Sequence, residues 1–296
     1  MSALLPFPVV DIHNHVIADD THRFPAAPMG GKQSDWSRER PVNATGMLQA
    51  MEVGGVAQSV LVQASTCYGH DNRYVAACVQ DHPNEFVGVF SVDFAGADAI
   101  ERIEHWLQAG LSGARVFVAG HTAADASVRL DDPRSISTWE YLTQRRIPVS
   151  VQLRSDKLDQ LQAVLARCPD ALVLLDHCAR PALEDGPPYA QANPLFALAK
   201  YPCLYLKYTT HNVRESKEGR ATQGSFARAL ADRFGAHRMA WGSNFPASAG
   251  GLGALLQEAL EATASLSAEE QAWIFSRTAR VLYPVLETAD AAKVSP

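Results

Sequence analysis

The chain has 296 residues, of which 47% are hydrophobic and 20% charged, and this composition excludes disordered and fibrous proteins. The formal net charge of −6, with no basic run, argues against nucleic acid as a partner. No stretch approaches the roughly 18 uninterrupted apolar residues of a membrane span, and the first residues lack the regions of a signal peptide. We therefore expect a cytoplasmic protein without a membrane partner.

Short β-branched and apolar runs alternate with longer amphipathic stretches. Apolar runs of this length are typical of strands buried on both faces of a parallel sheet. We predict eight strands, over residues 8–12, 58–63, 86–92, 113–118, 147–153, 171–176, 202–208 and 237–242. We predict helices near residues 43–54, 72–82, 97–109, 134–146, 156–168, 190–200, 221–235 and 253–264.

Eight such alternations favour an α/β fold of one domain over residues 1–296, a TIM (β/α)8 barrel, with a frayed tail at about 288–296. A doubly wound open sheet is the structural rival, but no Gly-rich phosphate loop follows the first strand. The aperiodic segment 17–42 follows that strand, so we expect a long loop over the C-terminal mouth of the barrel. The sequence leaves open whether the chain forms a homo-oligomer.

The cysteines show neither a C-x-x-C pair nor an even count. Cysteines spread in this way are typical of reduced thiols rather than of a disulfide framework or a structural zinc site. They are Cys67, Cys78, Cys168, Cys178 and Cys203.

A His-x-His pair, His13 and His15, lies at the end of the first predicted strand. Because side chains alternate along a strand, both imidazoles and Asp11 point to the same side. Two neutral imidazoles at this spacing suit a divalent metal or a hydrogen-bonding cradle for a substrate carbonyl. Such pairs are common by chance, and the position on a first barrel strand is what makes this one a candidate site.

Two further strands run directly into polar residues. The sixth ends in Asp176 and His177, and the eighth ends in Gly242, Ser243 and Asn244. Active sites of barrel enzymes are built at these C-terminal strand ends. A structural histidine and a simple turn are the plain alternatives for the two segments.

Taken in order, these segments resemble the amidohydrolase superfamily, and more closely its amidohydrolase-related branch, which includes 2-pyrone-4,6-dicarboxylate lactonases and sugar-lactone hydrolases. Further matching segments extend the resemblance over most of the chain. They are Leu61–Ser65, Gly69–Asn72, Gly113–Arg115 and Leu206–Lys207. Each motif is loose alone, whereas the ordered set is specific.

The resemblance implies that His13, His15 and His177 hold either one divalent metal, with zinc the first choice, or the substrate carbonyl. It also implies that Arg115 and Arg214 bind substrate carboxylates, for which a planar guanidinium is well shaped. Surface ion pairing is the alternative role for both arginines. Polar residues near other strand ends complete the candidates: Gln63, Gln152, Arg180 and Lys207 for substrate binding, and His211 for catalysis.

Asn244 departs from the family pattern, in which this position is an aspartate that binds metal or acts as general base. A neutral amide cannot take up a proton and is a poor metal ligand. The bridging lysine of two-metal members is also missing from the central strands, where Gln152 is the nearest polar residue. A two-metal site is therefore not expected.

Two mechanisms remain open. In the first, His13, His15 and His177 bind one Zn²⁺ that acidifies a water to a pKa near about 7, and Asn244 only orients that water or the substrate. In the second, no metal is present and His177 or His211 acts as the base. In both, we expect hydrolysis of a small, anionic, carboxylated lactone through an oxyanion.

Two other functions stay open at this stage. Decarboxylation or lactone isomerisation needs no water-activating base, so the loss of the aspartate favours it. A catalytically silent protein that kept the binding pocket is the third alternative.

Overall fold

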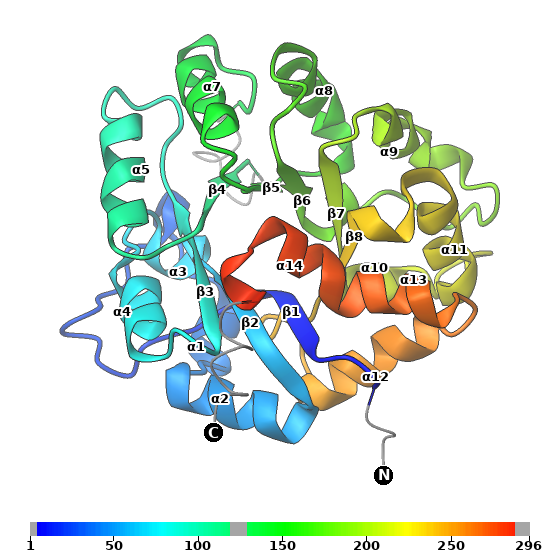
Figure 1. The fold of residues 1–296 in the computed structure, drawn as a ribbon, viewed down its shortest axis with the longest axis horizontal. Coiled ribbons are helices and arrows are strands. Elements are labelled where there is room, and N and C mark those ends of the chain that lie inside the picture. Colours follow the sequence, from blue (N-terminus) through cyan, green and yellow to red (C-terminus); the bar gives the residue numbers. More distant parts are fainter. Residues whose placement is uncertain (1–4, 119–128, 288–296) are drawn as a thin grey trace.

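The computed structural model describes residues 5–118 and 129–287 of the chain. Within this part, eight parallel strands form one sheet in the order β1 to β8, with helices around it (Figure 1). The strands are β1 Val9–Asn14, β2 Val56–Val62, β3 Phe86–Ser91, β4 Gly113–Phe117, β5 Val149–Gln152, β6 Val173–Leu175, β7 Leu204–Thr209 and β8 Met239–Gly242. The predicted TIM barrel is confirmed.

Helices follow the strands and pack around the barrel. The α-helices are α1 Asp35–Glu39, α2 Ala44–Gly54, α3 Ser65–Tyr68, α4 Arg73–Asp81, α5 Ala99–Gln108, α7 Ile136–Gln144, α8 Leu158–Arg167, α9 Asn193–Phe196, α10 Thr210–Glu215, α11 Gln223–Phe234, α12 Leu252–Ala262, α13 Ala268–Ala272 and α14 Thr278–Leu282. Short 3-10 turns are η1 Met29–Gly31, η2 Pro133–Ser135, η3 Ser155–Lys157, η4 Asp176–Ala179, η5 Ala190–Ala192, η6 Ala197–Lys200 and η7 Ala236–Arg238, and η8 Trp273–Arg277 is a π-helix. No described helix is long and apolar enough to cross a membrane.

The sequence predicted each strand and the main helices to within a few residues. One helix differs, because the segment predicted near 190–200 divides into η5, α9 and η6, with Pro194 early in α9. The sequence analysis also missed α13, η8 and α14. The predicted frayed tail lies outside the described residues.

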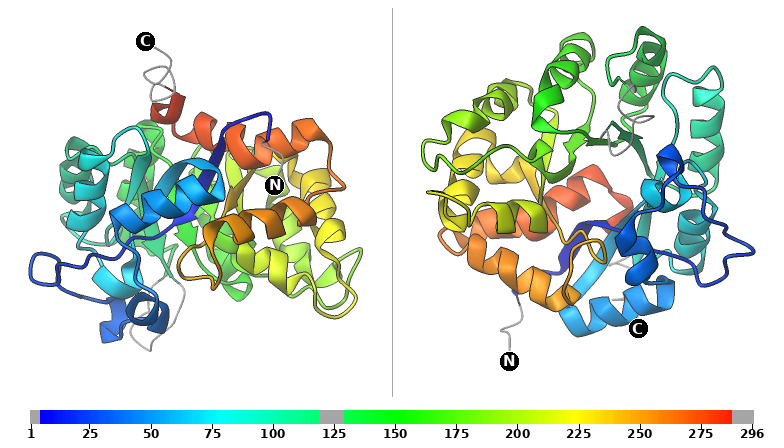
Figure 2. Two further views of the ribbon diagram at one scale, coloured as in Figure 1. Left: turned by 90° about the horizontal axis from the view of Figure 1, so that it is seen from below. Right: turned by 180° about the vertical axis from the view of Figure 1, so that it is seen from behind.

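The last helix, α14, closes one end of the barrel. Its Ala279 and Leu282 pack with strand side chains such as Val10, Ile12 and Val89 in a separate apolar cluster. Figure 1 shows α14 lying across the barrel end, and the left view of Figure 2 shows it on the side opposite to the loop after β1. One end is thus plugged, which leaves the C-terminal strand ends for a site.

The loop after β1 covers the other end, as the sequence predicted. Its ends meet where the amide of Ile17 donates to the carbonyl of Val42 at 2.8 Å. The amide of Ser34 donates to the carbonyl of Thr66, and the Arg40 guanidinium donates to Ala247 of the loop after β8. The segment is therefore tied to two other loops at the mouth, and it contains η1 and α1, which its aperiodic sequence did not predict.

Asp11 joins β1 to β8 beneath the mouth. One oxygen of its buried carboxylate accepts from the amides of His13 and Ser243 at 3.0 and 2.9 Å, and the other accepts from the Ser243 hydroxyl. Above this contact, the amide of Asn244 donates to the carbonyl of His13 at 2.7 Å. These bonds fix the strand that carries the His-x-His pair against the strand that precedes Asn244.

Candidate active site

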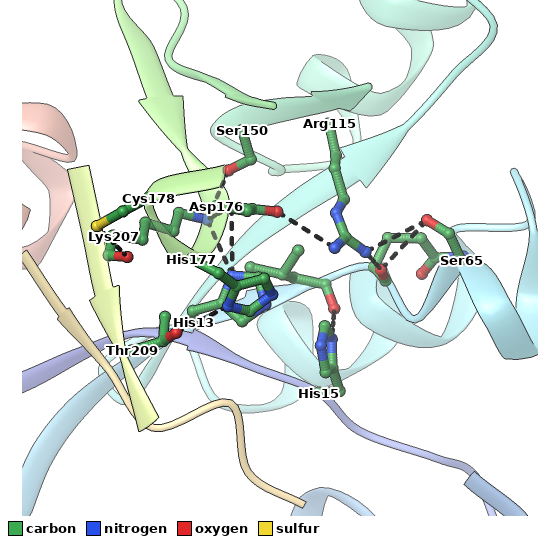
Figure 3. Close-up of polar contacts among 12 residues, drawn as sticks. His13, His15, Ser65, Arg115, Ser150, Asp176, His177, Cys178, Lys207 and Thr209 are labelled. Carbon is green, nitrogen blue, oxygen red and sulfur yellow. Dashed lines mark hydrogen bonds and ion pairs between the residues drawn. The ribbon is translucent and has the colours of Figure 1, made fainter. Parts of the chain in front are cut away.

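Histidines from three separate segments meet at the C-terminal mouth. The ring of His13 lies 5.0 Å from that of His15 and 4.9 Å from that of His177, which follows β6. His211, in the first turn of α10, lies 4.9 Å from His177 on its other side. The structure thus brings together the imidazoles that the sequence predicted to converge (Figure 3).

A pocket of about 270 Å³ opens beside these rings. Its lining combines basic and neutral polar side chains with two aromatic walls, and none of the described residues that line it is Asp or Glu. The lining residues are His15, Trp36, Ala64, Ser65, Thr66, Arg115, Phe117, Gln152, His177, Arg180, His211, Asn244 and Ala247. A larger hollow of about 800 Å³ lies at residues such as Leu5 and Met51, away from the histidines.

Four candidates from the sequence do not line the pocket: His13, Lys207, Gln63 and Arg214. His13 and Lys207 are fully buried beside it. Gln63 is buried too, and its amide donates to the carbonyls of Gly69 and Asp71.

Arg214 is the clearest departure, because its guanidinium forms a two-pronged ion pair with Glu258 at 2.8 and 2.9 Å. It takes the structural role that was its alternative. The position of Arg214 does not support its predicted role in substrate binding.

Asp176, for which the sequence predicted no role, is the centre of a buried charge network. Its carboxylate lies 3.0 Å from Lys207 Nζ and 3.2 Å from Arg115 Nη2, and Arg115 Nη1 donates to the carbonyl of Gln63. Burial alone would raise the pKa of Asp176, but Lys207, His13 and Arg115 together hold it well below its usual range. The network, drawn in Figure 3, fixes the side chain of Arg115, which lines the pocket.

The hydrogen-bond partners of His15 and His177 assign their tautomers. His15 Nδ1 lies 2.8 Å from the carbonyl of Val62, which only accepts, so Nδ1 carries the proton. His177 Nδ1 lies 2.8 Å from Thr209 Oγ1, whose own proton has an acceptor in Asn212 Oδ1 at 3.3 Å. His177 Nδ1 therefore carries a proton and donates to Thr209. The rings of His15 and His177 thus each keep a lone pair on Nε2.

The amide of Asn212 is oriented without ambiguity. Its oxygen accepts from the amide of Thr209 at 3.0 Å, and its nitrogen donates to the carbonyl of His177 at 2.8 Å. Thr209 and Asn212 thus hold His177 by side chain and backbone together. The sequence analysis missed both, although they sit where β7 passes into α10.

Burial keeps the imidazoles neutral. It lowers the pKa of His13 and of His211 to about 4, and it lowers the pKa of His15 and His177 well below 6.5. Near neutral pH the cluster therefore offers lone pairs and N–H groups rather than positive charge.

Left-handed backbone marks both strand-end motifs. Residues 177–180 have φ between 50° and 59°, and Asn244 has φ 56°. Such conformations cost of order 1–3 kcal/mol per residue and persist where the surroundings fix them, often at functional sites. The Asn244 side chain donates to Ser248 Oγ at 3.0 Å, which holds its amide at the pocket wall.

The predicted three-histidine metal site does not fit this arrangement. Among residues 5–118 and 129–287, no group of three or more His, Cys, Asp or Glu side chains is placed to hold a metal ion. Lys207 Nζ also lies 3.2 Å from His13 Nδ1, which puts an ammonium group beside one of the three expected ligands. Zinc binding by these histidines stays a prediction without geometric support.

Comparison with known proteins agrees with this fold. A family model described as amidohydrolase matches residues 10–285, and no curated protein matches the chain. A candidate 2-pyrone-4,6-dicarboxylic acid hydrolase from Pseudomonas putida is 20% identical with a TM-score of 0.74, covering 94% of this chain and 98% of its own.

Two other solved structures show a range of chemistry on the fold. An amidohydrolase from Burkholderia multivorans with bound zinc is 20% identical with a TM-score of 0.73, covering 94% of this chain and 99% of its own. A 2,6-dihydroxybenzoate decarboxylase complexed with 2,6-dihydroxybenzoate is 14% identical with a TM-score of 0.67, covering 94% and 99%. At these identities the likeness establishes the fold alone.

Proposed function

Because the chain belongs to the amidohydrolase family and is an enzyme of that superfamily, we propose that it hydrolyses a small carboxylated lactone. One observation carries the proposal: the pocket at the strand ends has two arginines and three histidines in its lining, and no acidic residue among the described ones. A volume of about 270 Å³ suits a small substrate rather than a polymer.

Arg115 and Arg180 supply the charge for a carboxylate. Arg115 is 4% exposed, and its Nε has no hydrogen-bond partner among the described residues. Arg180 pairs with Glu215, so it supports binding less than a free guanidinium would. A charge-assisted hydrogen bond to a buried guanidinium contributes about 1.5–3 kcal/mol, so Arg115 is the main anchor.

His177 is the proposed general base in place of the missing aspartate. Water attacks the lactone carbonyl carbon, its proton moves to Nε2 of His177, and the carbonyl π electrons move to oxygen. When the tetrahedral oxyanion collapses, the ring C–O bond breaks and the departing oxygen takes the proton back from His177. The lone pair assigned to Nε2 and the Thr209–Asn212 support suit this role.

Decarboxylation is the second candidate, and Asn244 is the observation that favours it. Loss of CO2 from an anionic substrate needs charge stabilisation and protonation of carbon but no activation of water. A decarboxylase is also among the proteins that share the fold.

Turnover of a panel of carboxylated lactones in ¹⁸O-labelled water tests the proposal. Hydrolysis incorporates the label into the product acid, whereas decarboxylation releases CO2 and isomerisation incorporates no label. His177→Gln should lower kcat by about 10²–10⁴-fold, and His22→Gln, at an exposed histidine of the loop, is the matched control. If the protein binds the lactones and converts none, it is a binding protein and the proposal is wrong.

A further inference from the structure

We propose that Lys207 is a positioning residue that fixes the proton of His13 on Nε2, so that this ring offers a hydrogen-bond donor where a metal ligand needs a lone pair. The inference deepens the proposed function, and only its kinetic consequence rests on that function. The tautomer itself is a property of the free protein.

Three contacts hold the Lys207 ammonium inside the barrel. Nζ donates to Ser150 Oγ at 2.7 Å and to His13 Nδ1 at 3.2 Å, and it lies 3.0 Å from Asp176 Oδ1. An ammonium group has three protons and no lone pair, so each neighbour must accept. His13 Nδ1 therefore carries the lone pair, and in the neutral ring the proton is on Nε2.

The alternative tautomer has its own acceptor, which makes the choice a real one. His13 Nδ1 also lies 3.4 Å from Asp176 Oδ1, and a proton on Nδ1 could be shared with that carboxylate. Lys207 Nζ is nearer to Nδ1, at 3.2 Å, and the same Oδ1 already faces the Lys207 ammonium at 3.0 Å, while Arg115 pairs with the other oxygen. With Lys207 in place, the geometry favours Nδ1 as the acceptor.

His13 then differs from its two neighbours. His15 and His177 each present Nδ1 to an accepting oxygen and keep a lone pair on Nε2. His13 Nε2 is buried and has no hydrogen-bond partner among the residues that the structure describes. A buried, unpaired N–H costs about 1–3 kcal/mol, which a water held at this point would recover.

The division of roles suits acyl chemistry better than metal binding. His13 is buried beside the pocket and does not line it, so its N–H stabilises oxyanion charge through its dipole rather than by contact, while His177, whose ring centre is 4.9 Å away, accepts the proton. A metal bound by all three rings would require three lone pairs and would meet the N–H of His13.

Removing Lys207 reverses the preference without leaving a buried charge unpaired. In Lys207→Met, Asp176 keeps its ion pair with Arg115, so the network goes from one excess positive charge to balance. Asp176 Oδ1 is then the nearest polar partner of His13 Nδ1, and the proton moves to Nδ1. The matched control is Lys200→Met, because Lys200 is exposed and lies just before β7.

Long-range ¹H–¹⁵N spectra of histidine-labelled protein measure the tautomer directly, with His13→Asn identifying the signals. We expect the proton on Nε2 in the wild-type protein and in Lys200→Met, and on Nδ1 in Lys207→Met. A proton on Nδ1 in the wild-type protein overturns the proposal even if Lys207→Met does not fold. An unchanged Nε2 proton in folded Lys207→Met shows that Lys207 does not set the tautomer.

Zinc affinity, measured by competition with a chelating dye, is the second readout. The freed Nε2 lone pair should raise the zinc affinity of Lys207→Met by about tenfold over wild type, within the range seen when groups behind metal-binding histidines are changed. Equal or weaker affinity contradicts the proposal. On a lactone substrate, kcat of Lys207→Met should fall on the order of a hundredfold with KM little changed. If the wild-type protein turns over no lactone while the spectra agree, the proposed function fails and the Lys207 assignment stands.

Discussion

Thr209 gives the sharpest test of how the proposed base is held. Its hydroxyl accepts from His177 Nδ1 at 2.8 Å and donates to Asn212 Oδ1 at 3.3 Å, yet Thr209 does not line the pocket. Thr209→Val keeps the shape and removes both bonds, whereas Thr209→Ser keeps the hydroxyl and removes a methyl group. The two variants therefore separate the hydroxyl from the packing.

The structure sets the size of the effect. The contact of Thr209 with Asn212 is part of the cap of α10, and losing such a cap costs about 1 kcal/mol, while losing the hydrogen bond from His177 costs about another 1 kcal/mol. We expect Thr209→Val to be about 2 kcal/mol less stable than the wild type. Without its acceptor, His177 can turn or change tautomer, and kcat should fall about 10- to 100-fold with KM little changed.

Urea unfolding and lactone kinetics on both variants check this reasoning. Thr209→Ser should keep kcat within a few-fold of wild type. Equal kcat values for the two variants would refute the role of Thr209 in holding His177. A rise in KM with unchanged kcat would instead show that Thr209 acts on substrate binding.

Three further predictions concern pH, the pocket wall and metal. The pKa of His211 falls from its ordinary value of 6.5 to about 4 in the folded protein, so between these two values the folded chain binds fewer protons than the unfolded chain. The free energy of unfolding therefore falls as the pH drops from 6.5 to about 4. Urea titrations should show that, at about pH 4, His211→Gln has lost roughly 3 kcal/mol less unfolding free energy than the wild type. An unchanged pH dependence in the variant would contradict this. Trp36 stacks on His15 with ring centres 5.3 Å apart. Trp36→Leu should therefore raise KM for a planar substrate about fivefold to tenfold and leave kcat nearly unchanged. A change confined to kcat would contradict a role of Trp36 in substrate binding. Dialysis against a chelator should leave activity intact, and a loss that zinc restores would instead support the three-histidine metal site predicted from the sequence.

The sequence predicted what depends on local pattern. Apolar runs marked each barrel strand, and strand-end position correctly grouped His15, His177 and Asn244 around one pocket. This works because parallel strands bring their C-terminal ends to the same side of a closed barrel.

The sequence could not predict which way a long side chain turns after its strand. Arg115 and Arg214 were both predicted to bind a substrate carboxylate, but Arg115 pairs with Asp176 inside the barrel and Arg214 pairs with Glu258. Each partner lies dozens of residues away in the chain, so no local pattern contains it. Trp36 was missed for a related reason, because a residue of an aperiodic loop reaches the pocket only through tertiary contacts.

The pocket has cationic walls and neutral, weakly basic histidines, so we expect the negative charge of the bound substrate to help His177 act as a base. Burial lowers the pKa of His177 well below 6.5, so in the free protein it would hold a proton poorly. An opposite charge within about 4–6 Å raises a pKa by about 1–3 units, and a bound carboxylate followed by an oxyanion brings such charge to the pocket. An aspartate in place of Asn244 would bring negative charge before the substrate arrives and would weaken binding at Arg115. Asn244→Asp should therefore raise KM for the carboxylated lactone and, in the same kinetic experiment, make kcat less dependent on His177. An unchanged KM would show that the asparagine does not serve to avoid repulsion of the substrate at this wall.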